Sequence, residues 1–257
     1  MADTKPYNAH LWKELAAMTL LSVGLYAVLF LLMQTAEWLW AARFGGKLLQ
    51  WSSPAFCIGV PASVLGTAYV LTVRNPQNYT GFYLGILMSV LLAVQCLLQG
   101  QPDLFVLYIF VFIPFLAMSL LKWRKAVLSG QQEDFVPAFL DRRRQALTLS
   151  AALLVIIIDY VLATFLFSDP SHRGDWLFNF MPKLLGGIMI AASLVANFWM
   201  IYKKNDAWVA WIVYCLAGLL MFTILGNVFS MLLFLVMLAV NVNAFAAWLR
   251  LSGSGKN

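Results

Sequence analysis

Two tryptophans and a cysteine share one side of an apolar stretch of the chain. In the segment DAWVAWIVYCLAG, Trp208, Trp211 and Cys215 stand at i, i+3 and i+7, a spacing that places side chains on one face of a helix. The faces of aromatic rings stack on flat heterocycles and attract ring cations. Tryptophans beside a charged turn also act as anchors at a membrane surface. The pattern predicts a stacking site for a flat small molecule at Trp211, one turn deeper, and either role for Trp208.

An acid lies deep inside another apolar stretch. Asp159 occurs in LLVIIIDYVLATF and is the only acid deep inside a stretch, since Glu37 lies near the end of the first one. An ionisable side chain at the centre of a bilayer costs at least about 2.5–3.5 kcal/mol, so it usually faces a cavity or a partner. Asp159 is therefore either a counter-ion or proton site for a substrate, or one half of a hydrogen bond between helices.

Amide side chains deep within the apolar stretches include Gln95, Asn197, Asn241 and Asn243. Amide hydrogen bonds between helices in a membrane are worth about 0.6 kcal/mol on average, so each amide either joins helices or contacts a substrate. Because Asn241 and Asn243 are two residues apart, they point to different faces of a helix, and at most one of them can face a shared cavity.

The residues that would indicate catalysis or metal binding are scattered. Cys57, Cys96 and Cys215 lie far apart in apolar stretches, and His10 and His172 fall in connecting segments. No CxxC pair, zinc-ligand spacing, HExxH motif or paired aspartates at membrane depth is present. The sequence predicts no cofactor and no metal, and it argues against an intramembrane enzyme. A membrane scaffold, which needs no motif, remains an alternative.

The composition places these residues in a membrane protein. The chain is 62% hydrophobic and 11% charged, with mean hydropathy +0.81, whereas soluble domains carry about 25% charged residues. The net charge of +6 resides in short connections between apolar stretches, which indicates membrane orientation and no nucleic-acid partner. Stretches long enough to cross the hydrocarbon core occur at 15–40, 52–73, 79–99, 103–122, 146–168, 184–202, 207–225 and 228–249.

The basic residues are distributed unequally between the two sides that these spans define. Only Arg43, Lys47, Arg173 and Lys183 fall on the side opposite the amino terminus. Because Lys and Arg accumulate in cytoplasmic loops, both termini are predicted to be cytoplasmic.

Two segments of the chain repeat the same order of features, 74–125 and 203–250. Each begins with a basic polar turn and an aromatic pair, continues to a glycine after one span, and closes on a tryptophan near an arginine. The matching residues are Tyr79, Phe82, Gly100 and Trp123 in the first segment, and Trp208, Trp211, Gly226 and Trp248 in the second. The order predicts two three-helix repeats that run the same way through the membrane, with the substrate site between them.

This order of features resembles the Pnu vitamin transporters, a family that includes transporters of nicotinamide riboside. The resemblance covers residues 52–250 and is best in the last part, where DAWVAWIVYCLAG is similar to the family's Asn-Trp-x-x-Trp signature, which an Asn or Asp follows four residues later. GNVFSMLLFLVMLAVNVNAFAAW is similar to the closing span of the family, including Asn243. The chain departs from the family pattern at Ala207, Cys215 and Leu225, so thiamine or riboflavin stays open beside nicotinamide riboside.

The resemblance implies an all-α SWEET-like core of 3+1+3 helices, with an extra helix at the amino terminus. It implies facilitated diffusion of a vitamin precursor through the inner membrane, trapping by a cytoplasmic kinase, and a homotrimer. The implied divisions are 1–45, 46–123 for the first repeat, 124–145 for a cytoplasmic linker, 146–168 for a linking helix, and 169–257. The predicted substrate-binding residues are Trp208, Trp211, Tyr79, Phe82, Gln95, Asn197, Asn243 and Asp159, although the place of Asp159 in the linking helix favours its structural role.

Overall fold

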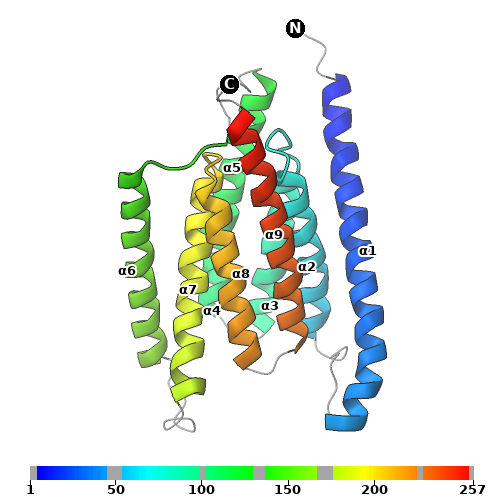
Figure 1. Cartoon of the computed structure of the whole chain (residues 1–257), viewed down its shortest axis with the longest axis vertical. Helices are drawn as coiled ribbons and strands as arrows, with labels where there is room; N and C mark the ends of the chain where they lie inside the picture. Colours follow the sequence, from blue (N-terminus) through cyan, green and yellow to red (C-terminus); the bar gives the residue numbers. More distant parts are fainter. Residues whose placement is uncertain are drawn as a thin grey trace. The chain divides into compact units, whose positions relative to one another are not determined.

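The computed structural model describes residues 5–44, 54–98, 102–129, 137–166, 176–224 and 228–254, and the regular structure in these ranges is helical (Figure 1). The helices are α1 (Lys5–Phe44), α2 (Pro54–Val73), α3 (Gly81–Leu98), α4 (Pro102–Leu107), η1 (Tyr108–Phe112), α5 (Ile113–Leu128), α6 (Arg142–Leu166), α7 (Trp176–Met200), α8 (Asp206–Ile224) and α9 (Val228–Ser254). In this described part, 8 segments are long and apolar enough to cross a membrane. The predicted all-α fold with about eight spans is confirmed. The predicted turn residues Gly100 and Gly226, together with His172 and Leu225, lie outside the described residues.

Two prolines in the second predicted span do not divide it. Pro54 opens α2, where its missing N–H has no helical partner to lose, and the helix continues through Pro61 to Val73. In the next span but one, α4, η1 and α5 follow one another without a gap, with a short π-helix before Pro114. The N–H of Ile113 bonds to the carbonyl of Tyr108, five residues back, at the place where proline interrupts the α-helical pattern.

The chain divides into two compact units, residues 1–136 and 137–257. In the first unit, α1 packs on α2, α2 packs on α3, and α3 packs on the continuous α4–η1–α5 span. Polar contacts support the first pair: Ser22 Oγ donates to the carbonyl of Val64 at 2.7 Å, and the hydroxyls of Tyr26 and Thr67 lie 3.2 Å apart. The amino-terminal helix is therefore an integral part of this unit.

One carboxylate fastens α1 to the turn that leads into α3. Glu14 Oε2 accepts from Asn75 Nδ2 at 3.0 Å and from Asn78 Nδ2 at 2.9 Å. Asn78 is fully buried, and its Oδ1 accepts from the N–H of Thr80 at 3.0 Å. Both amides thus hold the turn before α3 against α1.

In the second unit, α6 packs on α7, α7 on α8, and α8 on α9, which is the same order of packing as in the first unit. Gly187 allows α6 and α7 to approach closely, because an added Cβ would stand 3.3 Å from the carbonyl oxygen of Ile156. The helix at 146–168 that the sequence predicts as a link between repeats thus packs as the first helix of this unit.

Candidate functional site

The contact between α8 and α9 is built in three layers. At one end the rings of Trp208 and Trp248 meet edge to face, with centroids 5.3 Å apart and an interplanar angle of 84°. At the other end the ring of Phe234 fills the space beside Gly218, where no Cβ would fit. Because Phe234, Asn241 and Trp248 are each seven residues apart, they share one face of α9, and Asn241 forms the layer between the two aromatic ones.

The middle layer is polar and fully enclosed. Asn241 and Cys215 are both 0% exposed, and Asn241 Nδ2 lies 3.5 Å from Cys215 Sγ. The same Nδ2 donates to the carbonyl of Met237 at 2.8 Å. Asn241 Oδ1 has no hydrogen-bond donor in the described part of the chain. A buried acceptor without a donor costs about 1–3 kcal/mol, so this amide oxygen would gain from a ligand N–H or O–H if α8 and α9 move apart to admit one.

The structure separates the two predicted tryptophans by burial. Trp208 is 0% exposed and packs against Trp248, whereas Trp211 is half-buried and meets Tyr214 edge to face at 5.4 Å. Trp211 stands one turn from Cys215, on the same face of α8. Trp211 therefore keeps accessible ring surface next to the polar layer, and Trp208 joins the ends of α8 and α9.

The predicted residues of the first unit are mostly interior. Tyr79 and Phe82 are buried, and the ring of Phe82 lies 4.8 Å from Trp123, edge to face, and 5.7 Å from Tyr69. Gln95 is half-buried against α2, with its Nε2 2.9 Å from the position of an added Cβ at Gly59. Phe82 and Trp123 thus form a ring pair as Trp208 and Trp248 do, each pair within its own unit, although the predicted repeat matches Phe82 with Trp211 and not with Trp208.

The three remaining predicted residues lie at different places in the second unit. Asn197 is buried, and its Nδ2 donates to the carbonyl of Ser193 in its own helix at 2.9 Å. Asn243 is exposed, whereas Asn241 is buried, so the two amides do lie on different faces of α9. Asp159 is half-buried between α6 and α7, with Oδ2 3.2 Å from an added Cβ at Gly187. Asp159 therefore lies where α6 meets α7.

The turn before α8 forms a second polar centre, which sequence reasoning missed. Asn205 is fully buried; its N–H donates to the carbonyl of Ala138 at 3.0 Å, and its Nδ2 donates to Ser252 Oγ at 2.9 Å. Ser252 Oγ in turn donates to the carbonyl of Pro137 at 2.9 Å. The end of the predicted cytoplasmic linker, residues 137–141, is thereby bonded to the α7–α8 turn and to the end of α9. The sequence feature that could have predicted this centre is an asparagine shortly before the third helix of each unit, Asn78 before α3 and Asn205 before α8.

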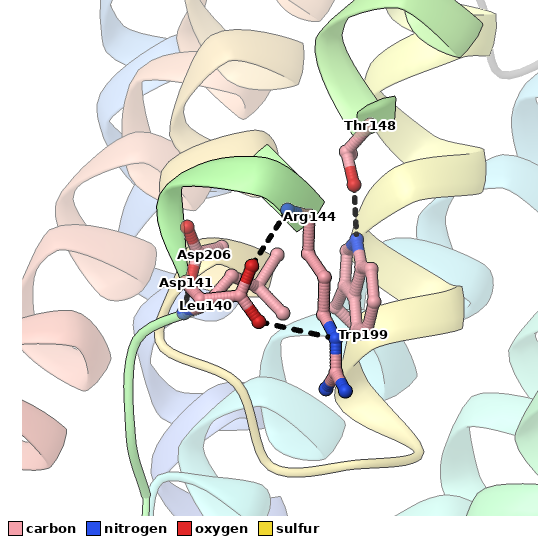
Figure 2. A network of polar contacts seen from close by, with 6 residues as sticks. All are labelled: Leu140, Asp141, Arg144, Thr148, Trp199 and Asp206. Atoms are coloured by element: carbon pink, nitrogen blue, oxygen red, sulfur yellow. Dashed lines mark hydrogen bonds and ion pairs between the residues drawn. The ribbon is translucent and has the colours of Figure 1, made fainter. Parts of the chain in front are cut away.

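An acid in the first turn of α8 binds the start of α6. Asp206 Oδ2 accepts from the N–H of Leu140 at 2.8 Å, and its Oδ1 accepts from Gln145 Nε2 at 2.9 Å (Figure 2 shows Leu140 and Asp206). A negative charge at a helix amino terminus is also favourable to the helix dipole. This carboxylate therefore fixes the approach of α6 to α8.

A lysine in the same turn is buried. Lys203 is 3% exposed and has φ of 50°, in the left-handed region that non-glycine residues rarely adopt. Burial disfavours the ammonium form and lowers the pKa of Lys203 to about 7. No feature of the sequence distinguishes Lys203 from Lys204, because burial here depends on how the turn folds.

A sequence model of the nicotinamide mononucleotide transporter family matches residues 56–250. The chain belongs to this family. The predicted membership of the Pnu transporters is confirmed, and the protein is a membrane transporter. Its fold is similar to that in the crystal structure of the vitamin B3 transporter PnuC, with a TM-score of 0.63 at 17% sequence identity, over 96% of this chain and 99% of that chain. Among curated proteins none matches the sequence.

The amino-terminal helix α1 lies outside the family match but inside the fold match. The family match begins at residue 56, after this helix, in keeping with the predicted resemblance over 52–250. The fold match covers 96% of the chain, which is too much to leave out the 40 residues of α1. The amino-terminal helix therefore belongs to the fold even though it falls outside the family's sequence pattern.

Proposed function

We propose that this transporter carries nicotinamide riboside by facilitated diffusion, with the pyridinium ring stacked on Trp211. The observation that carries the proposal is the family match over residues 56–250, which sets the class of substrate. The PnuC structure is that of a vitamin B3 transporter, which is consistent with the same class. Trp211 supports the stacking, because it keeps accessible ring surface one turn from the polar layer, and a cationic ring is attracted to the face of an indole.

The family's description names nicotinamide mononucleotide, which differs from the riboside by a phosphate. Proteins bind phosphate chiefly through Arg, Lys and backbone N–H groups, and an uncompensated anion is costly at membrane depth. Between Asp206 and Arg250 the sequence contains no Lys, Arg or His. The chemistry of α8 and α9 therefore favours the riboside.

The polar layer supports a role in reading the ribose or the carboxamide. Cys215 stands where the resemblance expects an Asn or Asp, and Asn241 supplies an amide from the facing helix. The free acceptor of Asn241 suits a hydroxyl or amide N–H of the substrate. The amide lost from α8 is thus replaced by one on α9. Asn243, exposed on the other face of α9, stays a proposed site residue, as do Gln95 and Asn197.

We further propose the finer architecture that the resemblance implies: a SWEET-like 3+1+3 core with parallel repeats, a homotrimer, and inner-membrane location with both termini cytoplasmic. The same packing order in both units and the two ring pairs, Phe82–Trp123 and Trp208–Trp248, support the repeats. The bias of basic residues supports the orientation.

Calorimetric titration of the detergent-purified protein tests the substrate. The ligands are nicotinamide riboside, nicotinamide mononucleotide, thiamine and riboflavin. The protein is compared with Trp211→Ala and with Trp12→Ala, a control at a tryptophan that is 49% exposed on α1. We expect saturable binding of the riboside, lost in Trp211→Ala and kept in Trp12→Ala. Preference for the mononucleotide would contradict the phosphate argument, and heat from none of the four ligands would favour the scaffold alternative.

A further inference from the structure

Three consecutive arginines open α6, and two of them have no partner among the residues that the structure describes. Asp141 Oδ1 accepts from the N–H of Arg144 at 2.8 Å, and its Oδ2 lies 3.2 Å from Arg144 Nε (Figure 2). Arg142 and Arg143 are exposed and form no ion pair or hydrogen bond within the described part of the chain. Cations in the first turn oppose the helix dipole. These two guanidinium groups therefore gain nothing from their own helix and are placed to meet an anion from outside.

The side of α6 that these arginines occupy faces away from α7. Thr148 marks the inner side, because its Oγ1 accepts from Trp199 Nε1 of α7 at 3.1 Å (Figure 2). At about 3.6 residues per turn, Arg142 and Arg143 lie on the side of the helix opposite Thr148. The two arginines diverge to either side of the line directly opposite Thr148.

Arg142 and Arg143 each lie at the start of a column of exposed leucines along α6. Side chains that are four, seven or eleven residues apart lie close to the same face of a helix. Arg142 stands above Leu149 and Leu153, and Arg143 above Leu147 and Leu154. These leucines are between 57% and 71% exposed: Leu147 62%, Leu149 71%, Leu153 58% and Leu154 57%. In the span Arg142–Phe165, 0% of the apolar window is buried, against 17% in the span Phe105–Leu128.

We propose that Arg142 and Arg143 bind the headgroup phosphate of an anionic phospholipid, whose two acyl chains lie along the two leucine columns. Guanidinium forks match the geometry of phosphate oxygens, and basic clusters at the end of a membrane helix attract anionic headgroups. Along α6 the arginines come first and the exposed leucines follow. A lipid leaflet has the same order, with the headgroup at the surface and the hydrocarbon chains below it. The ligand is a lipid and not free phosphate, because free phosphate would leave the apolar columns uncovered, whereas acyl chains can pack along them.

The test measures the thermal midpoint of the detergent-purified full chain during titration with phosphatidylglycerol or phosphatidylcholine. We expect phosphatidylglycerol to raise the midpoint and phosphatidylcholine to leave it unchanged. In Arg142→Gln/Arg143→Gln, the phosphatidylglycerol concentration that gives half of the shift in thermal midpoint should be at least about fivefold higher. That change corresponds to a loss of about 1 kcal/mol of binding. The matched control is Arg124→Gln/Lys125→Gln, which removes two exposed charges from the end of α5 and should behave like the parent.

Four results would overturn the proposal. Two of them concern the lipid: the Arg124→Gln/Lys125→Gln control loses the phosphatidylglycerol shift equally, or phosphatidylcholine gives an equal shift in the thermal midpoint. The third is the same shift with millimolar inorganic phosphate. The fourth is a change of oligomeric mass in the glutamine variant with no change in bound lipid. The last result would assign this surface to a second copy of the chain. If the glutamine variant does not fold, the parent protein decides: 0.5 M NaCl should shrink the phosphatidylglycerol shift, and an unchanged shift would refute the proposal.

Discussion

At the scale of single residues, Asn241 has a structural and a recognition role on different atoms. Its Nδ2 is used by Met237 and Cys215, which fixes the amide between α8 and α9, while its Oδ1 has no donor in the described chain. Removing the side chain takes away one helix bond and also one unsatisfied acceptor, two effects of opposite sign on stability. The function of Asn241 can therefore be separated from its contribution to folding.

Asn241→Ala is expected to raise the KM for nicotinamide riboside uptake at least about tenfold, which is a loss of roughly 1.4 kcal/mol of binding. The thermal midpoint in detergent should change little, for the reason just given. Asn243→Ala, two residues along on the exposed face, provides the comparison. A larger rise in KM for Asn243→Ala than for Asn241→Ala would contradict the place given to Asn241.

Lys203 makes stability depend on pH. Its folded-state pKa is about 7, below the usual 10.5, so between these values the unfolded chain binds a proton that the folded chain has released. Stability therefore rises as pH increases from about 7, and below pH 7 the folded state bears the full cost of a buried charge. We expect the thermal midpoint to rise between pH 7 and 9, and Lys203→Met to remove much of that rise. An identical pH profile in Lys203→Met would show that another group is responsible.

At the scale of helix pairs, close approach of α8 and α9 depends on Gly218. An added Cβ there would overlap the ring of Phe234. Gly218→Ala is expected to lower the free energy of unfolding by about 1–3 kcal/mol, the usual cost of overpacking. Gly186→Ala is the matched control, because an added Cβ at Gly186 meets nothing within 4 Å. It should be neutral or stabilising by up to about 1 kcal/mol. Equal effects of both substitutions in denaturant unfolding would refute this packing.

The attachment of α1 to the first unit depends on Glu14. Loss of its carboxylate leaves Asn78 Nδ2, in a fully buried side chain, with a 3.3 Å bond to the carbonyl of Leu11. Glu14→Ala should lower the free energy of unfolding by about 1–3 kcal/mol. Exchange of acid and amide in Glu14→Gln/Asn78→Asp restores the hydrogen bond with reversed polarity and should recover part of the loss. A double variant no more stable than Glu14→Ala would contradict this assignment.

At the scale of the whole chain, the sequence predicted the number of spans and the family, because hydropathy and the order of turns are properties of continuous segments. It also predicted that Trp208, Trp211 and Cys215 share a face of one helix. It did not predict that Trp208 packs on Trp248 or that Asn241 meets Cys215, since both depend on how α9 is rotated against α8. Contacts made by backbone atoms, such as the bond from the N–H of Asn205 to the carbonyl of Ala138, leave even less trace in the sequence.

The measurement that tests the central claim most directly is uptake of labelled nicotinamide riboside into proteoliposomes that contain the purified chain and no kinase. Saturable entry that stops when the concentrations inside and outside are equal is the predicted result. Sodium and proton gradients should have no effect, and unlabelled nicotinamide mononucleotide should compete weakly. Accumulation above the outside concentration would contradict facilitated diffusion, and equally rapid entry of the mononucleotide would contradict the riboside as substrate.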